Sequence, residues 1–331
     1  MLKGIHHTGI SVTDLDKAIK FYTRAGGFEL VHQFSLPNTA INRDAMDVAN
    51  SAAQVAWLKS PTAYLELLQF DRPTNTNALP PAVNDIGIRH ICLQAKDGNE
   101  LFDLAVSHGA SWHARPAGLG AANLYVYVRD PMNNVVELEG LPPVPKEGAP
   151  IWYGHTAYVV ENMEPMLEFY EVLTGLKRNR EGTFNPGEPF DTVTGLEGTH
   201  LQAGWIPVAN GNLEFWHYLA PQSSRRSSTQ ATDLGFNHTC FEVDDVVSSM
   251  RNLANVGVHF VSEAIVGDSN KVVFGRDPEN NLFSLISFDG QGERFSLDAL
   301  SGGRHPHDLA KPAANQQQLK QSHHYEQQTT G

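Results

Sequence analysis

The stretch GIHHTGISV, residues 4–12, places two adjacent histidines in what we predict to be a short β-strand. Neighbouring side chains on a strand point to opposite faces, so at most one of His6 and His7 is expected to face a shared pocket. The stretch returns as GIRHICLQA (87–95), WYGHTAYVV (152–160) and FNHTCFEV (236–243). All four copies keep one histidine in register, which predicts that His7 faces the pocket and His6 faces away.

The spacing of these copies indicates a duplicated pair. The aligned histidines are His7, His90, His155 and His238. The first two lie 83 residues apart, and so do the last two. A shift of 148 residues also carries Trp57 onto Trp205 and Glu66 onto Glu214. The chain is therefore predicted to contain four modules of one design.

Each module is predicted to hold a strand, a helix and three further strands. Helical spacing of apolar residues follows the first histidine strand, from Leu15 to Tyr22, and Gly26–Gly27 ends it. The last strands, YLELLQF (64–70) and VVELEG (135–140), each carry a glutamate. This βαβββ pattern, with His on the first strand and Glu on the last, resembles the vicinal oxygen chelate superfamily. That superfamily includes glyoxalase I, epimerases, extradiol dioxygenases and bleomycin-resistance proteins.

The resemblance covers residues 1 to about 288 and implies an α+β fold. Four βαβββ modules would pair into two cup-shaped mixed β-sheets. We expect a first domain at 1–140 with modules one and two, and a second at 151–289 with modules three and four. The Pro-rich LPPVPKEGAP at 141–150 reads as a linker, and the Gln-, Ser-, His- and Gly-rich segment 290–331 as a disordered tail. Whether module one pairs with module two or with module four stays open.

In this family a metal ion is held by residues from the first and fourth strands of two modules. Carried onto the first half, the resemblance implies His7, Glu66, His90 and Glu137 as ligands, a set similar to that of bacterial glyoxalase I. Imidazole and carboxylate together suit one divalent ion: Zn, Ni, Co, Mn or Fe. Two carboxylates in one cavity would repel each other, and a cation removes that conflict. Glu139 is an alternative to Glu137, but we expect it at the rim.

The second half departs from this pattern. It keeps His155, Glu214 and His238. The position equivalent to Glu137 is Ser284, which predicts a degenerate second site. Two histidines and one carboxylate could still form a facial triad, and Glu242 could supply the missing carboxylate. We expect the first half to be the active one.

The paired carboxylates favour enolate chemistry. The resemblance implies an isomerase, epimerase or lyase of glyoxalase I type, acting on a small substrate that chelates the metal through adjacent oxygens. Glu137 or Glu66 would take and return the proton. An Fe(II) extradiol dioxygenase is the first alternative, although Phe274, Asn280 and Ser284 stand where its signature needs Tyr, Gly and Glu. A metal-free binding or resistance protein is the second.

Composition limits the partners. A formal net charge of −13 argues against nucleic acid or an anionic membrane as the main partner. No apolar run approaches the roughly 20 residues of a membrane span. The two cysteines, Cys92 and Cys240, give no disulfide framework, and MLKGIHHTGI lacks the apolar core of a secretion signal. We expect a cytoplasmic monomer or homo-oligomer with a small-molecule substrate.

Overall fold

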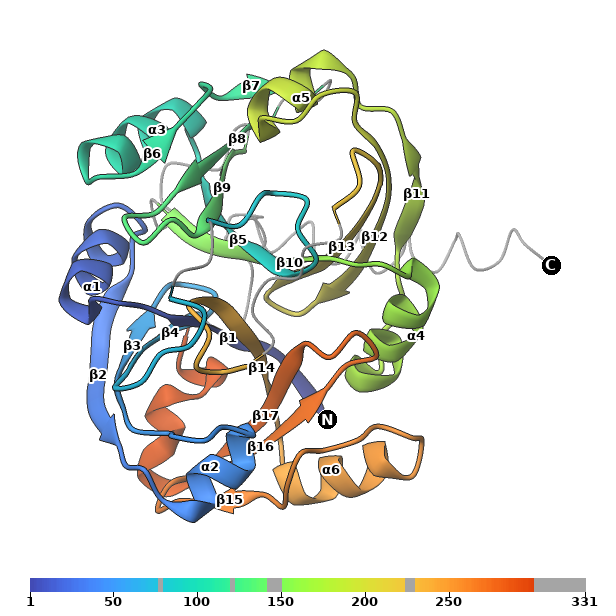
Figure 1. Ribbon diagram of the computed structural model, residues 1–331. Helices are drawn as coiled ribbons and strands as arrows, with labels where there is room; N and C mark the ends of the chain where they lie inside the picture. Colours follow the sequence, from blue (N-terminus) through green and yellow to red (C-terminus); the bar gives the residue numbers. More distant parts are fainter. Residues whose placement is uncertain (77–79, 120–122, 142–150, 224–229, 301–331) are drawn as a thin grey trace, which may run out of the picture.

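Two curled β-sheets dominate the computed structural model (Figure 1). The structure describes residues 1–76, 80–119, 123–141, 151–223 and 230–300. Each sheet curls into a cup, and the two cups lie back to back (Figure 1). The predicted α+β class with two cup-shaped mixed sheets is confirmed.

The first sheet contains eight strands. Its order is β15 (Ile265–Val266), β16 (Asn270–Arg276), β17 (Leu282–Phe288), β14 (Gly235–Val243), β1 (Leu2–Ser11), β4 (Tyr64–Phe70), β3 (Ala53–Lys59) and β2 (Glu29–Leu36). At its centre β1 pairs antiparallel with β14, and each of the two pairs in parallel with the last strand of its own module. Module one is thus joined to module four.

The second sheet is built in the same way from modules two and three. Its order is β11 (Arg180–Phe184), β12 (His200–Val208), β13 (Gly211–Ala220), β10 (Ile151–Val159), β5 (Gly87–Ala95), β9 (Val135–Gly140), β8 (Leu124–Arg129) and β6 (Ser111–Trp112), and β7 (Ala117–Gly118) also pairs with β8. The central antiparallel pair here is β10 with β5.

The sheets therefore cross the predicted domain boundary. Neither 1–140 nor 151–289 builds a sheet of its own, because the first and last modules share one sheet and the middle two share the other. Of the predicted linker 141–150, only the buried Leu141 lies within the described residues.

Helices cover the sheets through apolar faces. The elements are α1 (Leu15–Arg24), α2 (Ala40–Met46), α3 (Gly98–Ser107), α4 (Met163–Thr174), α5 (Glu188–Thr194) and α6 (Val246–Ala254). In α1 the carboxylate of Asp14 accepts a hydrogen bond from the Lys17 amide and so begins the helix. The Tyr22 hydroxyl at its buried face donates to Asp130 Oδ2 over 2.9 Å, which ties module one to module two.

The two cups also share one core. Apolar side chains of both sheets and of α1, α3 and α4 form a single buried cluster. Within it the hydroxyls of Thr8 and Thr156, equivalent positions on β1 and β10, lie 2.9 Å apart. A paired hydroxyl costs little when buried, whereas an unpaired one would destabilise this interface. This contact fixes the two histidine strands relative to each other.

The predicted tail is wrong in its first part. Residues after β17 form two short 3₁₀ helices, η1 (Gly290–Phe295) and η2 (Leu297–Ala299), and the rest, 301–331, lies outside the described residues. Leu297 and Leu300 are only 2% and 7% exposed and pack against Tyr64. Two well-placed leucines suffice to dock a short segment, although they form no apolar stripe that a periodicity search detects.

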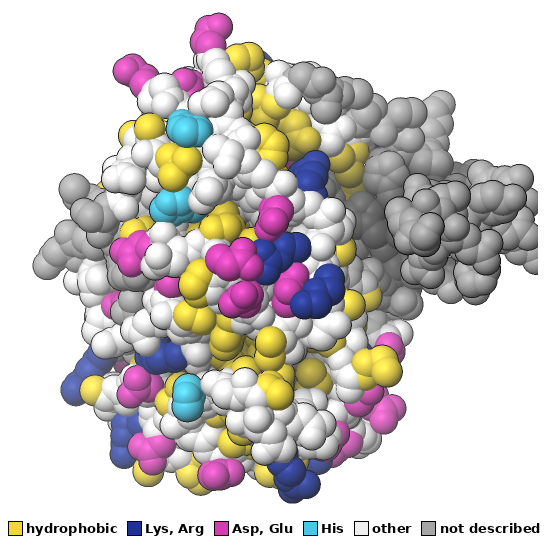
Figure 2. Space-filling view, turned by 90° about the vertical axis from the view of Figure 1, so that its right-hand side faces the viewer, with side chains coloured by type: hydrophobic (Ala, Val, Ile, Leu, Met, Phe, Trp, Pro, Cys, Tyr) yellow, Lys and Arg dark blue, Asp and Glu magenta, His cyan; other side chains and the backbone are white. Residues whose placement is uncertain are grey.

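Charges are interleaved on the face shown in Figure 2, where acidic and basic side chains alternate with scattered hydrophobic ones. At α4 the Arg178 guanidinium forms ion pairs with Glu164, Glu171 and Glu181. Within the described part of the chain, no helix is long and apolar enough to cross a membrane.

Candidate metal centres

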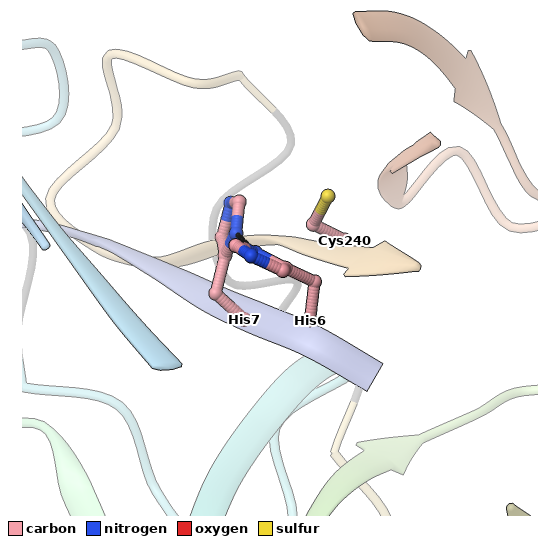
Figure 3. A group of neighbouring side chains, drawn as sticks. All are labelled: His6, His7 and Cys240. Atoms are coloured by element: carbon pink, nitrogen blue, oxygen red, sulfur yellow. Dashed lines mark hydrogen bonds between the residues drawn. The ribbon is translucent and has the colours of Figure 1, made fainter. Parts of the chain in front are cut away.

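A β-bulge precedes each aligned histidine. On β1 the register shifts between Ile5 and His7, which leaves His6 as the extra residue. The bulge turns His6 to the same side as His7, and their Nδ1 atoms lie 2.6 Å apart (Figure 3). The predicted alternation of faces therefore fails at this bulge, although of the two histidines it is His7 that lines the adjoining cavity. The equivalent bulge positions hold Arg89, Gly154 and Asn237.

Strand pairing distributes the predicted ligands over two centres. Centre A consists of His7, Glu66 and His238, and centre B of His90, Glu137, His155 and Glu214. The structure does not bring the predicted set together: its first two members lie in centre A and its last two in centre B. The reason is that β1 pairs with β14 and β5 with β10, rather than β1 with β5.

Centre B brings two imidazoles and two carboxylates to one point. The Nε2 atom of His155 lies 2.8 Å from Glu137 Oε2 and 3.3 Å from Glu214 Oε2. The Nε2 atom of His90 lies 3.3 Å from Glu137 Oε2 and 3.4 Å from the His155 Nε2. Each side chain is almost entirely buried, so this charge must be balanced locally.

These separations fit one shared divalent ion. Donors that each lie about 2.1 Å from one ion are about 3.0 Å apart in octahedral and about 3.4 Å apart in tetrahedral coordination. The measured distances of 2.8–3.4 Å fall in or close to that range. Among the described residues Glu137 Oε2 also has no well-aligned hydrogen-bond donor, although two imidazoles face it. The donor set suits Zn, Ni, Co, Mn or Fe.

A proton takes the place of the cation when centre B is metal-free. Burial alone would lower the pKa of His155, but the charge of Glu214 and the close contact with Glu137 raise it to about 9. Burial alone would raise the pKa of Glu137, but the close imidazoles of His155 and His90 hold it below its ordinary range. The metal-free centre is thus an ion pair at neutral pH.

Centre A is simpler and less polar. The Nε2 atoms of His7 and His238 lie 3.1 Å apart, and Glu66 Oε2 is 3.6 Å from each. Burial lowers the pKa of His238 to about 3 and raises the pKa of Glu66 to about 7. The fourth position holds Ser284, which pairs with Cys240 as Glu137 pairs with Cys92. The donors fit a two-histidine, one-carboxylate ion site.

The two centres open into different cavities. The cavity beside centre B has a volume of about 590 Å³ and a polar wall that includes Asn123, Asn179 and Arg180. The cavity beside centre A has a volume of about 210 Å³ and is lined mainly by apolar side chains such as Phe34 and Phe274. Ligands of different polarity therefore suit the two centres.

Tryptophans hold the carboxylates, and the sequence reasoning missed this role. The indole of Trp205 donates to Glu214 Oε1 over 2.7 Å, and that of Trp57 donates to Glu66 Oε1 over 2.8 Å. Trp216 adds a second donor to Glu214 at 3.2 Å. The signal was present, because the 148-residue shift superimposes the first two tryptophans as well as the two glutamates.

Two further carboxylates lie elsewhere than expected. Glu139 is buried and lines the centre B cavity rather than its rim, where it accepts hydrogen bonds from Gln94 and Asn123. Glu242 does not join centre A; it pairs with Lys3 at 3.1 Å and accepts from the Leu297 amide at 2.6 Å. It therefore anchors the C-terminal segment.

The family follows from a sequence match as well as from the fold. The model of the glyoxalase/bleomycin resistance protein/dioxygenase superfamily matches residues 4–138 and 152–285. The chain belongs to this superfamily. The two matches cover the two repeats that the 148-residue shift relates, while the sheets of this glyoxalase-superfamily chain combine modules from both matches.

Individual relatives are more distant. A lactoylglutathione lyase of Schizosaccharomyces pombe is 24% identical over 295 residues, covering 85% of this chain and 95% of that protein. A 2-epi-5-epi-valiolone epimerase of Actinomyces sp is 30% identical over 148 residues, covering 42% of this chain and 79% of that protein. Glyoxalase I from Zea mays shares the fold with a TM-score of 0.61 at 16% identity, covering 90% of this chain and 96% of that one. A putative dioxygenase from Bacillus subtilis reaches a TM-score of 0.60 at 13% identity, covering 97% and 96%.

Proposed function

We propose that this protein is a metal-dependent isomerase, epimerase or lyase of glyoxalase I type, with its reaction at centre B. The observation that carries the proposal is the convergence of His90, Glu137, His155 and Glu214 beside a large polar cavity. The names of two relatives, a lyase and an epimerase, support this class of reaction. The proposed metal ligands thus come from modules two and three, whereas the sequence predicted ligands from modules one and two.

The two carboxylates of centre B have different roles in this proposal. A divalent ion bound there would polarise adjacent substrate oxygens and acidify the neighbouring C–H group. Glu137 Oε2 contacts both imidazoles, so Glu137 is the fixed ligand. Of the two imidazoles of centre B, Glu214 pairs with that of His155, and its side chain is more exposed than that of Glu137, 12% against 8%. Glu214 therefore takes the substrate proton and returns it to a neighbouring carbon.

The cavity wall indicates an anionic, oxygen-rich substrate. The Arg180 guanidinium lies 3.8 Å above the ring of Trp205, which holds it at the cavity. Its fixed charge would bind a carboxylate or phosphate of the substrate. We expect Arg180→Ala to raise KM about tenfold or more with little change in kcat, because this contact is made equally in the ground and transition states. Steady-state kinetics check this, and an unchanged KM would remove the anionic group from the proposal.

The proposed function is tested by metal loading and proton exchange. Metal-free protein is loaded with Ni, Co, Zn, Mn or Fe and incubated in deuterated water with 2-oxo and 2-hydroxy carbonyl compounds and with lactoylglutathione. We expect metal-dependent exchange of the C–H hydrogen next to a carbonyl, lost on His155→Ala. Full metal loading without exchange or turnover of any such compound would contradict the proposal.

A specific observation favours a second function at centre A. Its two histidines and one glutamate leave coordination positions open, as in Fe(II) oxygenases, and its cavity is apolar. We propose that centre A also binds a divalent ion and accepts a less polar ligand. Anaerobic loading with Fe(II), followed by O₂ and catechols, tests the oxygenase alternative. Oxygen uptake with formation of a ring-opened product, both lost on His238→Ala, would establish ring cleavage at this centre, and uptake without that product would contradict it.

A further inference from the structure

Each histidine of centre A is backed by a hydrogen-bond acceptor, a feature that centre B lacks within the described residues. A neutral imidazole has one N–H and one bare nitrogen, and only the bare nitrogen can bind a metal. An acceptor that takes a hydrogen bond from one ring nitrogen holds the proton there, and so leaves the other nitrogen bare and able to bind a metal. The acceptors of His7 and His238 both come from the bulge positions.

The acceptor of His238 is fixed by its own contacts. Asn237 Nδ2 donates to the hydroxyl of Ser11 over 2.7 Å and to the carbonyl of Ala231 over 3.0 Å. Its amide oxygen must then face His238, whose Nδ1 lies 2.6 Å away and donates to it. The Nε2 atom of His238 is left bare and points toward His7.

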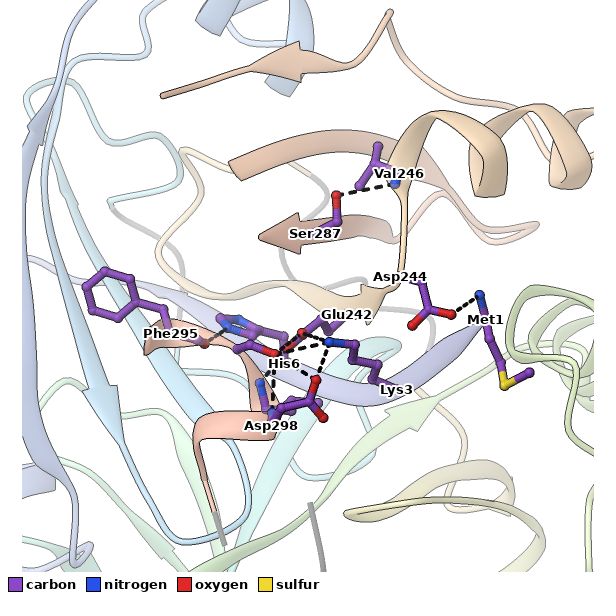
Figure 4. Close-up of polar contacts among 11 residues, drawn as sticks. Met1, Lys3, His6, Glu242, Asp244, Val246, Ser287, Phe295 and Asp298 are labelled. Atoms are coloured by element: carbon purple, nitrogen blue, oxygen red, sulfur yellow. Dashed lines mark hydrogen bonds and ion pairs between the residues drawn. The ribbon is translucent and has the colours of Figure 1, made fainter. Parts of the chain in front are cut away.

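The acceptor of His7 is set from the C-terminal segment. The carbonyl oxygen of Phe295 can only accept, so His6 donates to it from Nε2 over 2.9 Å (Figure 4). Nδ1 of neutral His6 is consequently bare and accepts from Nδ1 of His7 over 2.6 Å. The Nε2 atom of His7 is therefore bare as well. Two bare nitrogens 3.1 Å apart beside the Glu66 carboxylate form a site that a cation would complete.

The segment that supplies this carbonyl is firmly docked. Glu242 accepts hydrogen bonds from the Leu297 amide and the Ser296 hydroxyl, and it forms an ion pair with Lys3 (Figure 4). The ring of His6 itself stacks on Tyr64 at a centroid distance of 4.7 Å. Both ends of the hydrogen-bond chain are therefore held in place.

We propose that residues 290–300 are part of centre A, and that Phe295 acts through His6 to hold His7 in the tautomer that binds metal. His6 is thus a positioning residue, and metal affinity at centre A depends on the docking of this segment. This inference rests on the proposed ion at centre A. Centre B is independent of the segment: its bulge positions are Arg89 and Gly154, and His90 Nδ1 has no hydrogen-bond partner within the described residues.

The test compares metal binding at the two centres of the full chain. Metal-free wild type and variants are titrated with Zn(II) by calorimetry, and His155→Ala isolates centre A. We expect His6→Phe, which keeps an aromatic ring but removes the acceptor, to weaken Zn(II) binding at centre A about 10- to 100-fold while centre B is unchanged. His6→Asn should restore most of the affinity, because Asn237 performs this role at the equivalent position. Unchanged affinity at centre A in His6→Phe would refute the inference.

A second measurement does not depend on any variant folding. Nitrogen-15 NMR of the metal-free wild type distinguishes the two histidine tautomers. We expect the proton of His6 on Nε2 and that of His7 on Nδ1, and the reverse arrangement would overturn the inference. If wild type takes up no Zn(II) at centre A although the tautomers are as stated, the proposed metal at centre A fails, and the hydrogen-bond chain stands.

Discussion

Replacing Glu214 by Gln is expected to lower turnover at least 10²-fold while most of the metal stays bound at centre B. Loss of a general base costs about 10²- to 10⁴-fold. The ion would retain Glu137 and both imidazoles, the three donors with the most mutual contacts. Glutamine preserves the shape of the side chain and can still accept from the indole of Trp205. The measurement is kcat together with metal content for the same preparation.

Two further variants test whether the reaction runs at centre B or at centre A. Glu137→Gln should lose metal and activity together, because both imidazoles face that carboxylate. Glu66→Gln removes the equivalent carboxylate from centre A, where Trp57 replaces Trp205 as donor. The larger loss of turnover marks the centre at which the reaction runs. Loss confined to Glu66→Gln would place the proton transfer at centre A and contradict the assignment.

The fold could be predicted because its sequence pattern is repeated four times along the chain. The histidine strand, the following helix and the glutamate strand recur at fixed spacing, and each repeat supports the others. The same repetition prevented a prediction of which modules pair with each other. All four histidine strands carry the same pattern, so β1 could pair with β5 or with β14 on pattern alone. Contacts distant in sequence, such as Thr8 with Thr156, accompany the arrangement that forms.

The candidate ligands could be named individually but not grouped. Each of the seven side chains in the two centres was identified from its place on a first or last strand. Grouping them requires the strand pairing, which decides that His90 meets His155 rather than His7. The direction of His6 required the bulge, which adds one residue without any local sequence signal. Residues 290–300 dock on Glu242, which lies 48 residues before Gly290 in the sequence.

Metal-free protein should become less stable as pH rises from about 7 to about 9. Below pH 7 the trend is opposed by His7 and His238, because burial lowers the pKa of both histidines and the unfolded chain then binds the extra protons. Folding raises the pKa of Glu66 from 4.5 to about 7 through burial. The contribution of Glu66 to the free energy of unfolding is therefore complete below about pH 4.5 and is lost as pH rises through 7. Folding also raises the pKa of His155 from 6.5 to about 9, despite burial, through Glu214 and Glu137. The contribution of His155 to the free energy of unfolding is complete below pH 6.5 and is lost as pH rises through 9. Each shift corresponds to about 3 kcal/mol in the free energy of unfolding.

Bound metal should reverse this trend. An ion needs Glu66 ionised and His155 neutral, so protons compete with it at both centres and its stabilising effect grows with pH. The difference in Tm between metal-loaded and metal-free protein should therefore widen steadily from pH 5 to pH 9. Glu66→Gln should flatten the metal-free decline near pH 7 and leave the decline near pH 9, because its amide does not titrate. A metal-free Tm that rises between pH 7 and pH 9 would show that Glu66 and His155 do not hold protons where a cation would bind.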